Sequence, residues 1–124
     1  MLAIESNAEL LLFLLYVYNI SLQLLSNVPA FYYGTSPNKF FDYLSAGLPV
    51  FTNYPGWVAD LISENECGFY CDPGDSEKFA DQIINILNDK SKLKSMGAKA
   101  HSLAKNDFNR YDLSMKWFDW VFKV

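Results

Sequence analysis

The hydrophobic positions of this chain come in short blocks separated by polar turns. The first block, LLLFLLYVY at residues 10–18, predicts an apolar helix over residues 7–18, because it is continuous and too long for a typical buried strand. The next block, ISLQLL at residues 20–25, alternates between apolar and polar positions and predicts a strand.

A turn-rich segment then leads into a second helix, predicted over residues 37–46. Ser36 can cap the free amides of a helix start, Pro37 is tolerated at the first helical position, and Gly47 supplies a stop. On a helical wheel one face holds the apolar residues Phe40, Phe41 and Leu44. The opposite face holds Asn38, Lys39, Asp42 and Ala46. We therefore expect buried phenylalanines and an outward-facing amide, ammonium and carboxylate.

The remaining chain continues to switch between strand and helix. LPVFT after Gly47 is a short continuous apolar run, typical of a strand buried on both faces of a parallel sheet. The later predictions are a helix at residues 56–64, a strand in GFYC, a helix capped by Asp75 at residues 76–87, and helices at residues 92–104 and 112–122. In the helix at 76–87 the apolar face is expected to hold Phe79, Ala80, Ile83, Ile84 and Leu87.

This order of elements predicts the fold class. Strands that alternate with helices are typical of right-handed crossovers, so we expect an α/β fold with a Rossmann-like parallel sheet and flanking helices. The closing helices are expected to pack across the sheet.

Composition and charge narrow the classes of partner. The chain has 124 residues, of which 51% are hydrophobic and 17% aromatic, which is ample for one core. The net charge of -4 argues against general nucleic-acid binding, which needs a surplus of Lys and Arg on one surface. An anionic ligand would have to be held locally.

The cysteines and the apolar start of the chain are expected to have structural roles rather than to form a disulfide, a metal site or a membrane span. Cys67 and Cys71 would lie about 13 Å apart along a strand, too far for a disulfide. With His101 as the only histidine, no metal site is expected, and buried reduced thiols fit a reducing cytoplasm. The run at residues 10–18 has an acidic flank and is well short of ~20 apolar residues, so a buried helix is favoured over a signal peptide or membrane span.

Polar residues gather at two predicted strand-to-helix turns, which is where open α/β sheets bind ligands. At the first turn, Lys39 and the helix amides could face phosphates, and Asp42 could accept two hydrogen bonds from a ribose diol. The second turn is NYPGW, residues 53–57. The alternative is an ordinary helix start with an exposed Lys39–Asp42 pair of little energetic weight, and both interpretations are open on these residues alone.

A longer stretch carries a resemblance to a known family. The segments SPNKFFDYLSAGLPV, GW and CGFYCDPGD, in this order, resemble the nucleotide-sugar-binding half of family 4 glycosyltransferases with the GT-B fold, most closely the bacterial fucosamine-type transferases of cell-surface polysaccharide assembly. The resemblance runs from residue 20 to the C-terminus. It implies sugar transfer from a nucleoside diphosphate, usually UDP, with retention of configuration and without a metal or other cofactor.

The resemblance also implies roles for individual residues. Asp42 matches the second of two acidic family residues, the one that holds the ribose hydroxyls, whereas Gly34 stands where many relatives have the first. The expected donor-binding residues are Gly34, Thr35, Ser36, Asn38, Lys39, Asp42, Gly56 and Trp57. The aromatic residues nearby, Tyr32, Tyr33, Tyr54 and Trp57, are expected to pack rather than to stack on a ligand.

The departures from the family pattern limit what the chain is expected to do. The family's N-terminal domain, with the acceptor site and a catalytic His or Asp, has no counterpart, so the catalytic residue is unknown. Residues 1–38 contain no Lys, Arg or His, although the family places a basic pair for the diphosphate early in this half. We therefore expect residues 1–19 to be an apolar, degenerate segment and residues 20–124 to be a partial nucleotide-sugar-binding domain.

The resulting expectation is a donor-binding fragment that has no transferase activity alone. One alternative is a split transferase completed by a partner chain that carries the missing domain. The other is a small membrane-associated or structural protein whose residues 10–25 insert into the membrane. The expected location is the cytoplasm or the inner face of the cytoplasmic membrane. A strand at residues 20–25 without its preceding neighbour would leave an open edge, so the chain is expected to be poorly soluble or oligomeric.

Overall fold

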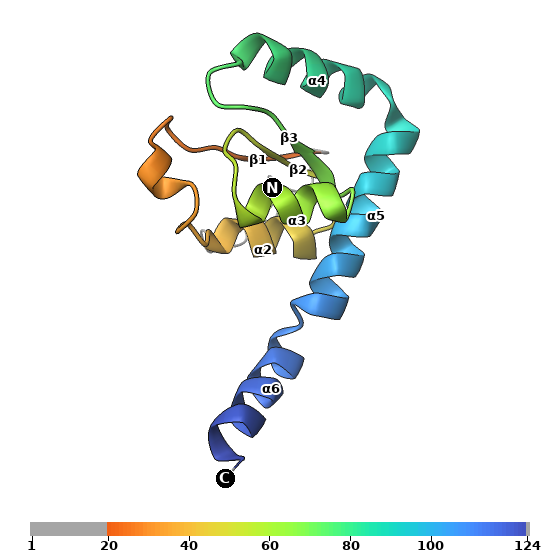
Figure 1. Cartoon of the computed structure of the whole chain (residues 1–124). Coiled ribbons are helices and arrows are strands. Elements are labelled where there is room, and N and C mark those ends of the chain that lie inside the picture. Colours follow the sequence, from red (N-terminus) through yellow and green to blue (C-terminus); the bar gives the residue numbers. More distant parts are fainter. Residues whose placement is uncertain (1–19, 124) are drawn as a thin grey trace, which may run out of the picture.

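The computed structural model describes residues 20–123 and shows an α/β fold on a small parallel sheet (Figure 1). The strands are β1 (Ser21–Gln23), β2 (Val50–Thr52) and β3 (Gly68–Tyr70), in the spatial order β1-β2-β3. β2 is parallel to both neighbours, with Phe51 opposite Leu22 on one side and opposite Phe69 on the other. The predicted fold class is confirmed.

Helices connect and follow the strands. Their bounds are η1 (Pro29–Phe31), α2 (Asn38–Ser45), α3 (Trp57–Glu64), α4 (Ser76–Asn88), α5 (Lys90–Asp107) and α6 (Arg110–Phe122). Each helix predicted after residue 36 is present, and Gly47, with a φ of 69°, follows the end of α2 in the left-handed conformation that glycine favours. The helix predicted at residues 7–18 lies outside the described residues.

The core has one hydrophobic cluster on each face of the sheet. α2 and α3 cover one face, where Phe40, Leu44 and Ile62 are fully buried, and α4 covers the other, where Ile86 packs near Phe51. α5 serves both clusters, because its first half contributes Leu93 and Met96 to the α4 side and its second half contributes Ala100 and Leu103 to the α2 side. β2 is buried along its whole length, as predicted.

Two element boundaries differ from the prediction, each through a local hydrogen bond. β1 ends at Gln23 rather than Leu25, because the Asn53 side chain accepts from the Leu25 N–H and donates to the Leu25 carbonyl, both at 2.9 Å. The side-chain amide thus takes the place of a strand neighbour. α2 starts at Asn38 with Pro37 at the cap position, and Ser36 makes no capping bond. The predicted cap at Ser36 is therefore wrong.

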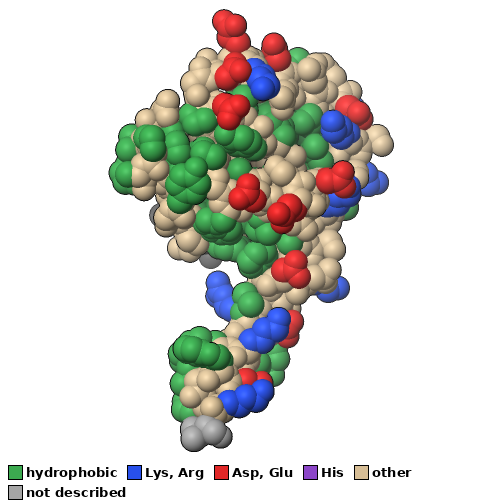
Figure 2. Space-filling view, in the orientation of Figure 1, with side chains coloured by type: hydrophobic (Ala, Val, Ile, Leu, Met, Phe, Trp, Pro, Cys, Tyr) green, Lys and Arg blue, Asp and Glu red, His purple; other side chains and the backbone are tan. Residues whose placement is uncertain are grey.

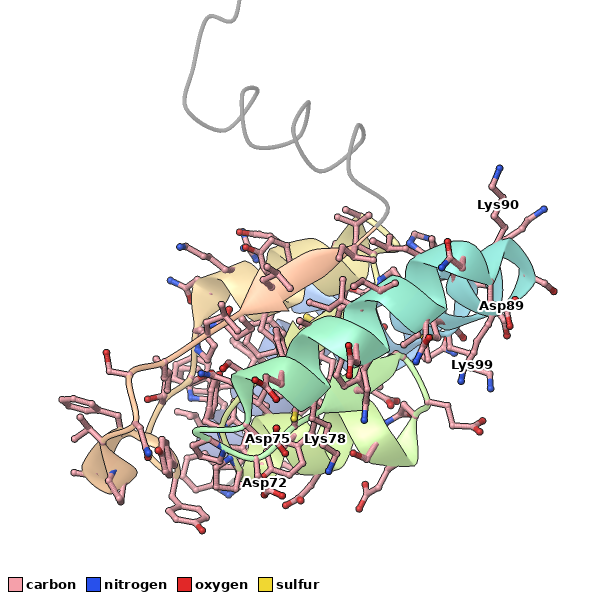
Figure 3. All side chains as sticks on the ribbon, turned by 90° about the horizontal axis from the view of Figure 1, so that it is seen from above. Asp72, Asp75, Lys78, Asp89, Lys90 and Lys99 are labelled. Atoms are coloured by element: carbon pink, nitrogen blue, oxygen red, sulfur yellow. The ribbon has the colours of Figure 1, made fainter. Side chains whose placement is uncertain are left out.

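The cap of α4 is as predicted, but its apolar face is not. The Asp75 side chain accepts from the Lys78 N–H at 3.1 Å, and Figure 3 shows both residues at the start of this helix. Phe79 and Ile83 are half-buried and Ile86 is buried, whereas the other predicted face residues, Ala80, Ile84 and Leu87, are exposed. The covered side of α4 is rotated from the predicted one, because it is the side that meets Phe51, Phe69 and α5.

The closing helices behave differently from one another. α5 packs along the body as expected, whereas α6 projects away from it and has no buried residue, so the expectation that α6 packs across the sheet is wrong (Figure 1). Figure 2 shows hydrophobic side chains gathered on this projection. The exposed hydrophobic residues of α6 include Trp117, Phe118, Trp120 and Phe122, and Trp120 is 78% exposed.

The outer side of β1 has no strand beside it in the part of the chain that the structure describes. Leu22 and Leu24 are exposed near this edge. Within residues 20–123, no helix is both long and apolar enough to cross a membrane.

Candidate functional site

The first turns of α2 present the polar residues that the sequence singles out. The helix starts on the side where the parallel strands end, because it follows the crossover from β1. Phe40 and Leu44 are fully buried and Phe41 is half-buried, while Asn38, Lys39, Asp42 and Ala46 are exposed. The predicted division of this helix into an apolar and a polar face is therefore confirmed.

The loop before α2 is held against the start of α3. The Trp57 indole N–H donates to the Thr35 carbonyl at 2.9 Å, and the Thr35 hydroxyl donates to the Phe31 carbonyl. The Trp57 ring packs against Phe40 and Phe41, with ring centres 5.9 and 6.3 Å away. Thr35 and Trp57 are thus brought together, as the shared border of one site requires, but both have structural partners.

The two glycines of this region differ in what surrounds them. Gly56 has a φ of 118°, and a Cβ there would lie 2.8 Å from the Tyr32 carbonyl oxygen. A Cβ at Gly34 would meet nothing within 4 Å. Gly56 is therefore required by the backbone, whereas the backbone at Gly34 is open to approach.

The aromatic residues around the loops are mostly packing residues, as expected. Tyr32 and Tyr54 are buried and stack on each other with ring centres 6.3 Å apart. Burial raises the pKa of Tyr54, which keeps its hydroxyl neutral. Tyr33 differs from the others, because its side chain is 71% exposed.

A cavity between α2 and α6 joins part of the predicted site to residues that the sequence did not single out. We call it the α2–α6 cavity; its volume is about 730 Å³. Its lining residues are Asn38, Phe41, Asp42, Phe108, Arg110, Leu113, Ser114 and Trp117. This volume is within the range of small-molecule sites, about 300–1,000 Å³.

Of the eight predicted donor-binding residues, only Asn38 and Asp42 line the α2–α6 cavity. Lys39 is exposed on the same helix but does not line it, and Ser36 is exposed in the preceding loop. The cavity residues that sequence reasoning missed are Phe108, Arg110, Leu113, Ser114 and Trp117. Positions 110, 113, 114 and 117 have the spacing of a single helix face, but this spacing does not say that the face meets α2.

A second cavity, of about 670 Å³, lies where β2 begins rather than where the strands end. Leu48 and Pro49 line it together with Lys90, Lys94 and His101, whose Nδ1 is 3.0 Å from the Ser45 carbonyl oxygen. None of the predicted donor-binding residues lines it. The α2–α6 cavity is therefore the candidate site.

The cysteine thiols and the possible metal ligands are the other reactive groups among the described residues. Cys67 and Cys71 are buried free thiols, as predicted, and burial raises the pKa of Cys67 to about 11. Across residues 20–123, no three His, Cys, Asp or Glu side chains are grouped so that they could hold a metal ion.

Comparison with known proteins shows the family. Residues 28–103 match the model of the family described as Glycosyl transferases group 1. The chain is also similar to N-acetyl-alpha-D-glucosaminyl L-malate synthase of Bacillus anthracis, with 28% identity over 65 residues. This match covers 52% of the chain and 17% of the relative, so the chain corresponds to a small part of that enzyme's length. Because the family match extends over more than half of its residues and includes α2, the loops beside it and α3, this chain belongs to the group 1 glycosyl transferases.

Proposed function

We propose that this chain binds a UDP-linked sugar and serves sugar transfer in the assembly of a cell-surface polysaccharide. Membership of the group 1 glycosyl transferases supports the reaction class. The observation that carries the donor proposal is the α2–α6 cavity, where the exposed Asp42 carboxylate and the Asn38 amide meet aromatic walls. The residues around SPNKFF favour a fucosamine-type transferase as the finer class.

The chemistry of the cavity suits a nucleoside. A carboxylate accepts two hydrogen bonds from a ribose diol, and Asn38 adds both a donor and an acceptor. Phe41 and Trp117 provide flat apolar surfaces for a base or a sugar face. We therefore assign Asp42 to the ribose and the aromatic walls to the rings of the donor.

Titration of the full chain with uridine, 2′-deoxyuridine and UDP tests the donor proposal. We expect uridine to bind more tightly than 2′-deoxyuridine, and Asp42→Asn to weaken uridine about tenfold, since a hydrogen bond to a charged group contributes about 1.5–3 kcal/mol. The matched control is Asp60→Asn, which removes an exposed carboxylate on α3. No binding of any of the three ligands, or equal effects of both variants, would rule the proposal out.

We expect no sugar transfer by this chain alone. Transfer needs an acceptor hydroxyl aligned with the anomeric carbon, and positive charge where the diphosphate leaves. The exposed hydrophobic side chains of α6 favour a second folded unit that docks on this helix and supplies the acceptor side. Co-purification with such a unit, followed by a transfer assay with a lipid-linked acceptor, tests this split arrangement; transfer by the isolated chain would contradict it.

Location is part of the same proposal. The two buried free thiols suit a reducing compartment, and we place the chain in the cytoplasm, at the inner face of the membrane where a lipid-linked acceptor would be used. Membrane insertion through residues 10–25 stays a prediction, because most of that segment lies outside the described residues. Partition of the purified chain into liposomes tests it.

A further inference from the structure

Among the described residues, one positively charged side chain lines the α2–α6 cavity, and it belongs to a helix that the donor prediction did not include. Arg110 is the first residue of α6, and it is the one Lys, Arg or His among the described residues that line this cavity. The sequence places no basic residue before Lys39, and Lys39 does not line the cavity. A diphosphate bound there would therefore meet positive charge from α6 rather than from the early part of the chain.

The residues just before Arg110 fix its position beside the cavity. Phe108, at the end of α5, packs on Phe41 of α2 with ring centres 5.1 Å apart. The turn into α6 is thus anchored beside the cavity. The Asn109 side chain accepts from the N–H groups of Tyr111 and Asp112, at 3.0 and 3.3 Å. Because the cap already occupies these two amides, the Arg110 side chain is the group through which the start of α6 can offer positive charge to an anion.

The two charged side chains that line the cavity have no polar partner within residues 20–123. Among the described residues, neither Arg110 nor Asp42 takes part in an ion pair or in a side-chain hydrogen bond. They come from different walls, Asp42 from α2 and Arg110 from α6, and both are exposed. A ligand with a diol at one end and phosphates at the other can satisfy both groups at once, whereas a neutral sugar would leave Arg110 without an anionic partner.

We infer that Arg110 binds the phosphate groups of the nucleotide in the α2–α6 cavity. The inference rests on the proposed function and deepens it. The planar guanidinium can donate two parallel hydrogen bonds to phosphate oxygens, which an ammonium cannot do. Ser114, one turn along the same face of α6, also lines the cavity, but its hydroxyl already donates to the Tyr111 carbonyl at 2.8 Å, so Arg110 is the phosphate donor that this face offers.

The test compares uridine, UMP and UDP as ligands of the full chain, by calorimetry at low ionic strength. We expect wild-type protein to bind UDP at least tenfold more tightly than uridine. Arg110→Gln should remove most of this difference, weakening UDP about tenfold or more while leaving uridine within twofold. Arg110→Lys should restore part of the UDP affinity, because it keeps the charge but loses the bidentate geometry.

The control is Lys116→Gln, which removes a positive charge from α6 at a position that does not line the cavity. If Arg110→Gln changes UDP binding no more than this control, or weakens uridine equally, the inference is wrong. That result would leave the proposed function standing as long as Asp42→Asn still weakens the binding of both uridine and UDP. If wild-type protein binds none of the three, the proposed function and the inference fail together. Arg110 is exposed, so unchanged thermal unfolding is expected and confirms that each variant folds.

Discussion

At the scale of single residues, Gly56 offers the clearest structural prediction. A Cβ there would stand 2.8 Å from the Tyr32 carbonyl oxygen, and the φ of 118° is unfavourable for any residue with a side chain. We expect Gly56→Ala to lower the free energy of unfolding by about 2–3 kcal/mol, from backbone strain plus the overlap. Urea unfolding monitored by circular dichroism measures it.

Gly34→Ala is the matched control, because the added methyl group would meet nothing within 4 Å. We expect a change of less than about 0.5 kcal/mol. Equal stability of the two variants would show that the contact between the Gly56 turn and Tyr32 is not tight.

Cys67 gives a prediction about pH. Burial raises the pKa of its thiol from the usual 9.0 to about 11, so between these values the unfolded chain has lost a proton that the folded chain retains. Stability therefore falls as the pH rises through this window, by an amount on the order of 1 kcal/mol at pH 10.5. Chemical unfolding of wild type at pH 7.5 and 10.5 measures the loss.

Cys67→Ala should show a smaller loss over the same interval, although it is less stable at both pH values because it leaves a small cavity. Part of the loss will persist, since burial also raises the pKa of Tyr54 and raises that of Tyr70 to about 12. An unchanged loss in Cys67→Ala would contradict the assigned role of the thiol.

The site could be predicted from the sequence as far as one helix is concerned. Helical spacing places Asn38 and Asp42 on the open side of α2, away from Phe40 and Leu44, and the structure agrees. Arg110 follows these residues by more than sixty positions, and local spacing does not say which distant helix faces α2. The packing of Phe108 on Phe41 decides that, and it is a tertiary contact.

At the scale of elements, the start of α4 and the start of α2 give opposite predictions for two capping candidates. Asp75 accepts from the Lys78 N–H, so Asp75→Ala should cost about 1 kcal/mol. Ser36 makes no capping bond to α2, so Ser36→Ala should change the unfolding free energy by less than about 0.5 kcal/mol. Thermal unfolding of both variants side by side measures the difference, and a larger cost at Ser36 would mean that α2 is capped after all.

The elements themselves follow from pattern more reliably than their ends and faces do. The strand-helix alternation after residue 20 predicts the parallel sheet, because glycine and proline turns separate the apolar blocks clearly. The end of β1 depends on the Asn53 side chain, and the covered side of α4 depends on Phe51 and Phe69. Such partners lie far away in the sequence, so periodicity within one element does not reveal them.

At the scale of the whole molecule, two apolar surfaces have no cover among the described residues. α6 exposes Trp120 and Phe122, and the outer edge of β1 exposes Leu22 beside backbone groups that no strand pairs with. Both features favour association, since exposed apolar helices and open edges are typical contact surfaces. We expect the isolated chain to form oligomers at micromolar concentration or above, measured by sedimentation velocity.

The two surfaces can be separated by variants that leave the α2–α6 cavity intact. If α6 drives association, Trp120→Gln with Phe122→Gln shifts the chain toward monomer, whereas Leu22→Lys does so if the β1 edge drives it, because lysine on an edge strand opposes pairing. Ile84→Gln, at an exposed position on α4, is the control for a general gain in solubility. We expect the α6 pair to have the larger effect, because its side chains are the more exposed and belong to a helix that touches little else.

A wild-type chain that sediments as a monomer at all concentrations would show that neither surface self-associates. The docking of α6 on a second folded unit would then depend on complementarity that this chain does not offer to itself.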